Sequence, residues 1–229
     1  MVQSKTLKAT SAVNFNRFMA LVYMVMAVGM VVTALVSTSV SQNPDMMKRI
    51  LYDPWFTFGL FMIQILIVVW LSAAIKRLSP VVAFLLFLLY SAVTGLAISA
   101  IFIYYSQSVI SYTFWLAAGM FFLASIIGFF IKGDMSPVGS FLILALMGWI
   151  FGTFFIWLLP VSQGFNQLMN FTGILLFAGL TVWDTNRLKV LSQELNGKRG
   201  MGGIVILGAL ALYLDFINLF LLLLRTSRR

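Results

Sequence analysis

Two aspartates late in the chain, Asp184 and Asp215, have the strongest potential for chemistry. Asp215 interrupts the apolar run 204–224, and the next charged residue is Arg225. An ionised carboxylate at such depth in a bilayer costs at least about 2.5–3.5 kcal/mol, so Asp215 should face protein or a hydrated cavity. Asn218 falls on the same helix face and is a candidate partner. A purely structural role for Asp215, as a hydrogen-bonding group that holds the last helix to its neighbours, is the alternative.

Asp184 lies near the end of the preceding apolar segment, where Arg187 could pair with it on one helix face. Because the two segments are consecutive and antiparallel, the carboxyl groups of Asp184 and Asp215 can come close together. Two neighbouring carboxyl groups away from water cannot both ionise cheaply, so they compete for a proton. When ionised, they can separate or bind a hard cation such as Ca2+ through their oxygens. The pair therefore predicts a proton-controlled gate for cations.

An aspartate pair on consecutive helices also occurs in intramembrane aspartyl proteases, where the two carboxyl groups activate water. Those enzymes carry the second aspartate in a Gly-x-Gly-Asp motif, whereas Asp215 follows Leu212-Tyr213-Leu214. A later Pro-Ala-Leu segment, also typical of those enzymes, does not occur in this sequence. Because both features are missing, we expect no protease chemistry and no enzymatic activity.

The composition indicates that Asp184 and Asp215 belong to a membrane protein. Hydrophobic residues make up 62% of the 229 residues and charged residues 9%, against roughly 45–50% and 25% in soluble domains. Apolar runs of about 18 residues or more recur along the chain, which predicts an all-α polytopic membrane protein. We expect one seven-helix membrane domain, residues 17–225, between a polar N-terminal tail, 1–16, and a short basic tail, 226–229.

Seven apolar segments are expected to cross the bilayer, at about 18–36, 55–75, 81–104, 112–131, 138–159, 168–188 and 203–224. The pairs Ser79-Pro80 and Ser136-Pro137 should open the third and fifth segments. Serine can cap the first free amides of a helix, and proline fits the first turn, where no amide hydrogen is needed. Asp134 lies in the tight loop before Ser136 and is assigned a turn or capping role.

The formal charge of +9 comes from 15 Lys and Arg residues against 6 Asp and Glu residues. In a soluble protein such an excess would suggest a nucleic-acid partner. Here the basic residues lie between apolar runs, so we expect them to meet anionic lipid headgroups and to set the orientation in the bilayer. Their distribution predicts a cytoplasmic N-terminus and an external C-terminus. Cysteine and histidine are both absent, which excludes disulfides, thiol chemistry and a histidine pH sensor.

The last apolar segment contains the run Ala211-Leu212-Tyr213-Leu214-Asp215-Phe216-Ile217-Asn218-Leu219-Phe220. This run resembles the last-helix signature of the Bax inhibitor family, in particular its short bacterial branch. Supporting matches are Leu89-Tyr90-Ser91-Ala92-Val93-Thr94-Gly95-Leu96, Lys132-Gly133-Asp134-Met135-Ser136 and Gly179-Leu180-Thr181-Val182-Trp183-Asp184-Thr185. The resemblance implies a seven-helix fold with a central last helix, enclosed by helices one to three and four to six.

The resemblance further implies a pH-sensitive Ca2+ leak in a bacterial cytoplasmic membrane, controlled by an aspartate pair that matches Asp184 and Asp215. Apart from Ca2+ as the permeant or bound ion, no cofactor is implied. In some relatives a second-helix arginine pairs with the first aspartate, and the nearest candidate here is Arg77. The alternative function is that of an interaction protein, because some bacterial relatives are substrates and modulators of a membrane-anchored AAA protease and eukaryotic ones associate with stress or cell-death factors. The polar N-terminal tail is then a candidate handle for such a partner.

Overall fold

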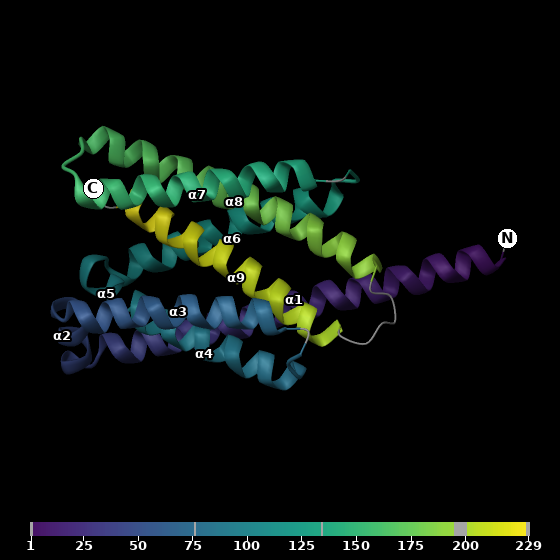
Figure 1. Ribbon diagram of the computed structural model, residues 1–229, viewed down its shortest axis with the longest axis horizontal. Helices are drawn as coiled ribbons and strands as arrows, with labels where there is room; N and C mark the ends of the chain where they lie inside the picture. The colour runs from purple at the N-terminus through teal and green to yellow at the C-terminus, as the bar shows by residue number, and fades with distance from the viewer. Residues whose placement is uncertain (1, 76, 134, 195–200, 228–229) are drawn as a thin grey trace. The chain divides into compact units, whose positions relative to one another are not determined.

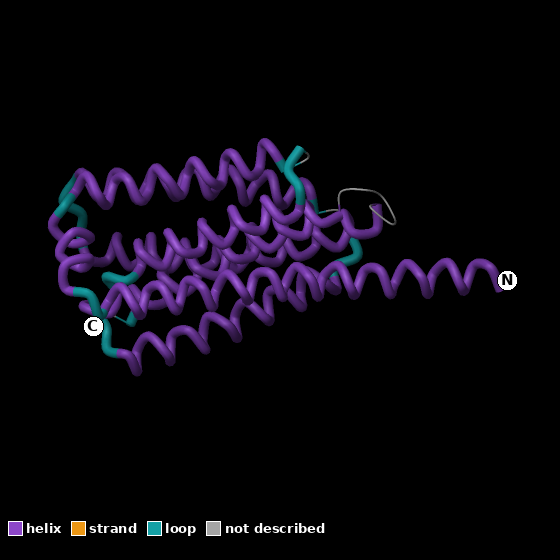
Figure 2. The backbone as a smooth tube through the Cα atoms, turned by 90° about the horizontal axis from the view of Figure 1, so that it is seen from below, coloured by secondary structure: helices purple, strands orange, loops and turns teal. Residues whose placement is uncertain are grey.

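The computed structural model describes residues 2–75, 77–133, 135–194 and 201–227, and within these ranges it contains helices and loops but no strand (Figure 2). In chain order the helices are α1 (Val2–Ser41), α2 (Pro44–Tyr52), α3 (Pro54–Ala74), α4 (Pro80–Ile98), α5 (Ile101–Tyr104), α6 (Gln107–Phe130), α7 (Ser136–Leu158), α8 (Gln163–Glu194) and α9 (Met201–Thr226) (Figure 1).

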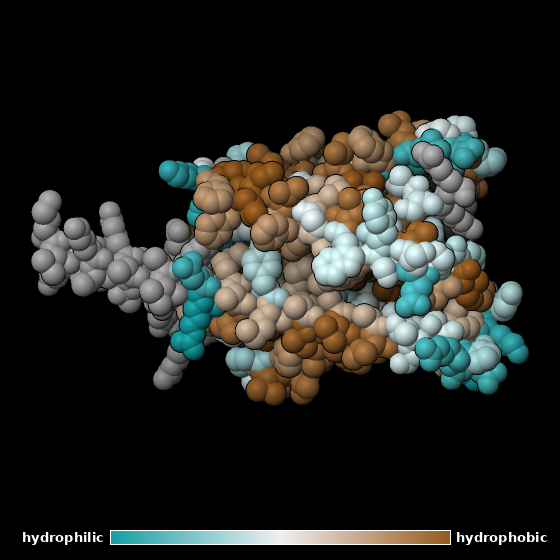
Figure 3. All heavy atoms as spheres, turned by 180° about the vertical axis from the view of Figure 1, so that it is seen from behind, coloured by the Kyte–Doolittle hydropathy of each residue, from teal (hydrophilic) through white to brown (hydrophobic). Residues whose placement is uncertain are grey.

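Seven helical segments of the described chain are long and apolar enough to span a membrane. They are Asn16–Ser41, Pro54–Ala74, Pro80–Tyr104, Gln107–Phe130, Ser136–Ile156, Gln163–Ser192 and Met201–Thr226. Each overlaps the segment predicted from the sequence. On the face seen in Figure 3, hydrophobic residues cover much of the surface. The protein is therefore an all-α polytopic membrane protein. Helix α1 is longer than its span because it begins at Val2, so the polar N-terminal tail is helical from Val2 onward.

Two of the helices are preceded by a residue with a short polar side chain, which is followed by proline. The side-chain oxygen of Asn43 accepts hydrogen bonds from the backbone amides of Asp45 and Met46, both at 3.1 Å, and so caps α2. Asp53 caps α3 in the same way. These contacts satisfy amides that have no partner within the helix. Helix α2 was not predicted from the sequence, and it connects the first two spans while burying Met47 and Ile50.

The two Ser-Pro pairs begin their helices differently. Ser79 caps α4, with its hydroxyl oxygen 3.3 Å from the amide nitrogen of Val82, as predicted. Helix α7 begins at Ser136, as the Ser-Pro pair predicted, but its cap residue is Met135, whose side chain makes no cap hydrogen bond. A capping role for Ser136 stays a prediction. The backbone turns at Met135 (φ −95°, ψ 10°), so Ser136 falls within the first turn. Asp134 lies outside the described residues.

The chain divides into two compact units, both of which include part of α9. Unit 1 comprises Met1–Ser106 and Ser192–Tyr213, and unit 2 comprises Gln107–Leu191 and Leu214–Arg229. Each unit therefore contains three of the first six spans and one portion of the last helix. Among the described spans α9 is the most buried. This division is consistent with the predicted central place of the last helix.

In unit 1 the first part of α9 is held by the hydroxyl group of Tyr213. Its oxygen lies 2.6 Å from Oγ1 of Thr33. Thr33 donates its single hydroxyl proton to the carbonyl oxygen of Ser91 at 2.9 Å, so Tyr213 is the donor to Thr33. The Tyr213 ring also packs edge-on against Phe87 and Tyr90, with ring centroids 5.6 and 5.9 Å away. These contacts fix α9 two residues before Asp215.

Candidate functional site

Unit 2 brings Asp184 of α8 and Asp215 of α9 together. Their side chains are 9% and 4% exposed, respectively. The two carboxyl groups lie close enough to interact electrostatically and to share a hydrogen bond. Atom Oδ2 of Asp215 is nevertheless buried without a hydrogen-bond partner among the described residues. The structure therefore places two acidic groups side by side, away from the surface, with unused hydrogen-bonding capacity.

One threonine of α8 adds a hydroxyl group beside this pair, and a second lies next to it in the sequence. Thr181 lies within hydrogen-bonding reach of Asp215, and its hydroxyl group donates to the carbonyl oxygen of Phe177 at 2.8 Å. The hydroxyl oxygen of Thr185, next to Asp184 in the sequence, is buried and has no hydrogen-bond partner within the described chain. The carboxyl oxygens of the pair and the hydroxyl oxygen of Thr181 thus lie near one another, and all of them are hard oxygen ligands.

The predicted partner Arg187 acts on Asp184 electrostatically from the exposed side of α8. Its guanidinium carbon lies 5.3 Å from the centroid of the Trp183 ring, which is the geometry of a cation–π contact. The charge is therefore held beside the aspartate by a neighbouring side chain on the same helix.

The other two predicted partners occupy different places. Asn218 is half-buried and donates its amide hydrogen to the carbonyl oxygen of Leu214, at 2.8 Å, within its own helix. Arg77 belongs to unit 1, where its side chain is exposed, whereas both aspartates belong to unit 2. The roles of Asn218 and Arg77 as gate partners therefore stay predictions.

The end of α8 near Asp184 is attached to the end of α6 by side chains that the sequence did not single out. The amide nitrogen of Asn186 donates to the carbonyl oxygens of Gly128 and Ile131, at 3.2 and 3.0 Å. The ammonium group of Lys189 donates to the carbonyl oxygens of Phe129 and Ile131, at 2.7 and 3.2 Å. The last carbonyls of a helix lack partners within it and attract cations. Asn186 and Lys189 therefore cap α6 from a neighbouring helix.

We expect Asn186→Ala to lower the melting temperature of the purified protein. The substitution removes the Asn186 donor from the carbonyl oxygen of Gly128, whereas Ile131 keeps Lys189 as a donor. An unsatisfied buried acceptor costs about 1–3 kcal/mol. Thermal unfolding in one detergent measures the effect. The control is Asn166→Ala, because Asn166 is an exposed asparagine of the same helix. Equal melting temperatures for the two variants would show that the Asn186 cap contributes no stability.

In the described part of the chain, no group of three or more His, Cys, Asp and Glu side chains could hold a metal ion. Asp184 and Asp215 would offer two carboxylates to a cation. Ca2+ takes roughly 6–8 oxygen ligands, so hydroxyl groups, backbone carbonyls and water would have to complete its coordination. The two carboxylates would therefore coordinate a hard cation only together with these additional oxygen ligands.

A known family and several related proteins each match nearly the whole chain. The family described as "Inhibitor of apoptosis-promoting Bax1" matches residues 15–227. Inner membrane protein YbhL of Escherichia coli (strain K12) is 40% identical over 215 residues, covering 93% of this chain and 91% of its own. A Deinococcus radiodurans protein is 38% identical over 225 residues, which cover 98% and 93% of the two chains. A Borreliella burgdorferi protein is 36% identical over 215 residues, covering 92% and 90%. The chain with the buried Asp184 and Asp215 pair thus belongs to the Bax inhibitor family.

Proposed function

We propose that the protein is a pH-sensitive leak for cations, principally Ca2+, gated by Asp184 and Asp215. The observation that carries the proposal is the meeting of two buried carboxyl groups from consecutive membrane helices within one unit. Groups of this kind inside a membrane protein are rare and commonly mark ion or proton pathways. The inner-membrane relative YbhL supports a cytoplasmic-membrane location, and the Lys and Arg distribution supports a cytoplasmic N-terminus.

The gate would work through the number of protons on the pair. With one proton, the carboxyl groups share a hydrogen bond that holds α8 against α9. With none, two like charges repel each other in a setting of low dielectric constant. Their oxygens then separate or are neutralised by a cation. Proton concentration and cation occupancy are thereby coupled at one site, and histidine is not needed.

Flux measurements on the full chain in liposomes that contain a Ca2+ dye test this proposal. We expect Ca2+ flux to differ between about pH 6 and pH 8, and this difference to disappear in Asp184→Asn and Asp215→Asn, which cannot ionise at those positions. Asp45→Asn is the control, because Asp45 is an exposed aspartate of α2. Equal flux at both pH values, or an unchanged pH response in the two site variants, would contradict the gate.

A second candidate function is regulation through a protein partner, such as a membrane-anchored AAA protease. It is favoured by the helical extension of α1, which begins at Val2 although the membrane span begins at Asn16. Deleting residues 2–15, with flux and partner binding measured separately, distinguishes the two functions. Loss of binding in a protein that never conducts Ca2+ would favour the regulatory function. Retained flux with a retained pH response would favour the leak.

A further inference from the structure

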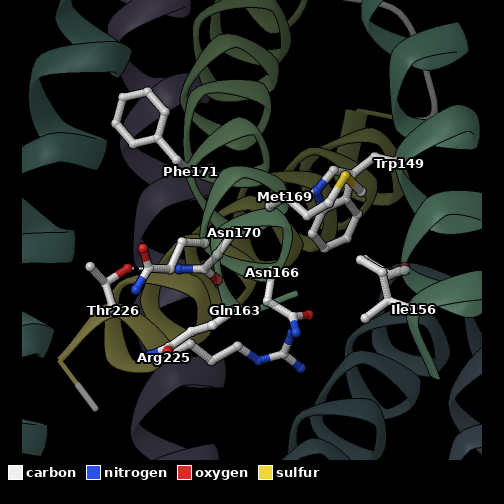
Figure 4. Close-up of a pocket in the computed structure, with 11 residues that line it drawn as sticks. Trp149, Ile156, Gln163, Asn166, Met169, Asn170, Phe171, Arg225 and Thr226 are labelled. Carbon is white, nitrogen blue, oxygen red and sulfur yellow. Dashed lines mark hydrogen bonds between the residues drawn. The ribbon is translucent and has the colours of Figure 1, made fainter. Parts of the chain in front are cut away.

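A pocket of about 590 Å³ lies within unit 2, between the last turns of α7, the first turns of α8 and the end of α9 (Figure 4). Its volume falls within the range of roughly 300–1,000 Å³ that is common for small-molecule sites. None of its lining residues takes part in the Asp184–Asp215 pair. The pocket is therefore a separate candidate site.

The polar wall of the pocket is rich in hydrogen-bond donors. It carries the amide groups of Gln163, Asn166, Gln167 and Asn170 and the guanidinium group of Arg225. None of the lining residues is acidic. Arg225 is exposed, and no ion pair or hydrogen bond joins its side chain to another described residue. In Figure 4 its side chain extends toward Asn166. An available guanidinium group surrounded by amides favours an oxyanion, above all a phosphate.

Asn170 adds a hydrogen-bond acceptor to the site, besides the positive charge of Arg225. Its amide nitrogen donates to the carbonyl oxygen of Leu222 at 2.9 Å and to Oγ1 of Thr226 at 2.7 Å, the second of which is drawn in Figure 4. Both amide hydrogens are therefore used, and the orientation of the amide is fixed. The Oδ1 atom of Asn170 is left buried without a hydrogen-bond partner. This acceptor needs a donor, which a ligand hydroxyl group would supply.

The pocket lies at the level where three membrane spans end. These spans end or begin at Ile156, Gln163 and Thr226, and all three residues line the pocket. This level corresponds to the boundary between hydrocarbon and lipid headgroups. Met169 and the ring of Trp149 add an apolar part to the wall. A ligand with a polar head and an apolar body would match both parts.

We propose that this pocket binds a negatively charged phosphodiester that carries hydroxyl groups, the chemistry of the phosphatidylglycerol headgroup. The phosphate lies against Arg225, and a hydroxyl group donates to Oδ1 of Asn170. The same headgroup chemistry is available from the lipid itself and from the soluble glycerophosphodiester that remains when its acyl chains are removed.

Native mass spectrometry of the full chain in detergent tests the proposal, with phosphatidylglycerol, phosphatidylcholine and glycerophosphoglycerol added separately. We expect phosphatidylglycerol to bind at least tenfold more tightly than phosphatidylcholine, and Arg225→Gln to reduce this affinity by about tenfold or more. Arg225→Lys keeps the charge and should restore most of the affinity. Arg49→Gln is the control, because Arg49 is an exposed arginine of α2 in unit 1.

The two sources of the headgroup give different results. If the lipid binds and glycerophosphoglycerol does not compete with it, the ligand is the membrane lipid. If glycerophosphoglycerol competes at a similar concentration, the site takes the soluble phosphodiester. Phosphatidylglycerol affinity that is the same in Arg225→Gln and in the wild type overturns the proposal. A melting temperature of Arg225→Gln equal to that of the wild type shows that loss of binding does not come from misfolding.

Discussion

Replacing Gly128 with alanine should destabilise the protein and disturb the aspartate site, whereas the same change at Gly119 should not. Both glycines belong to α6. A Cβ atom on Gly128 would overlap the carbonyl oxygen of Val182 in α8, and it would lie 3.0 Å from Cβ of Thr185. The carbonyl group is part of the backbone and cannot turn away as a side chain could. Helices α6 and α8 would therefore have to move apart, at the turn of α8 that carries Asp184.

The expected loss for Gly128→Ala is about 1–3 kcal/mol, the usual range for overpacking. It should lower the melting temperature by about 2–4 °C per kcal/mol for a chain of this size. At Gly119 nothing lies within 4 Å of an added Cβ. Gly119→Ala should therefore be neutral or gain about 0.5–1 kcal/mol through helix propensity. Equal melting temperatures for the two variants would mean that the α6–α8 contact is looser than the structure shows.

The membrane spans could be predicted because their signal is local. Runs of apolar residues long enough to cross a bilayer must form helices that satisfy their own backbone. The same argument placed Asp184 and Asp215 on consecutive antiparallel helices, where they could meet. Helix α2 was missed because its nine residues are too few for a sequence pattern to distinguish a helix from a loop. Asn43 and Asp53 each precede a proline, and each caps a helix.

Contacts between distant parts of the chain could not be predicted from local patterns. In the sequence Asn186 is one of several polar residues before Arg187, and only the position of α6 shows that it caps the carbonyls of Gly128 and Ile131. The pocket is built from residues of three helices, including Asn170 and Arg225. In the sequence these residues belong to separate segments, so no spacing rule connects them. They are brought together by packing between helices. The residues that make such contacts follow no fixed spacing in the sequence.

Replacing Asp215 with asparagine should remove a loss of stability that we expect for the wild type at alkaline pH. Alkaline pH favours the state in which both carboxyl groups of the pair are ionised, and two negative charges then lie side by side in a buried setting. Their repulsion is little screened there. Asparagine has nearly the same shape, carries no charge, and can donate an amide hydrogen to Asp184. The variant should thus keep its stability over the pH range in which the wild type loses it.

Thermal unfolding in detergent from neutral to alkaline pH measures this difference without any flux assay. An uncompensated buried charge costs about 3–5 kcal/mol, so at high pH the Asp215→Asn variant should melt about 6–20 °C above the wild type. Asp45→Asn should follow the wild type, because Asp45 is exposed in α2. If the melting temperature of Asp215→Asn fell as steeply as that of the wild type, the two carboxyl groups would not be coupled. The gate would then lack its physical basis even if the protein conducts Ca2+, because a proton on one aspartate would not affect the other.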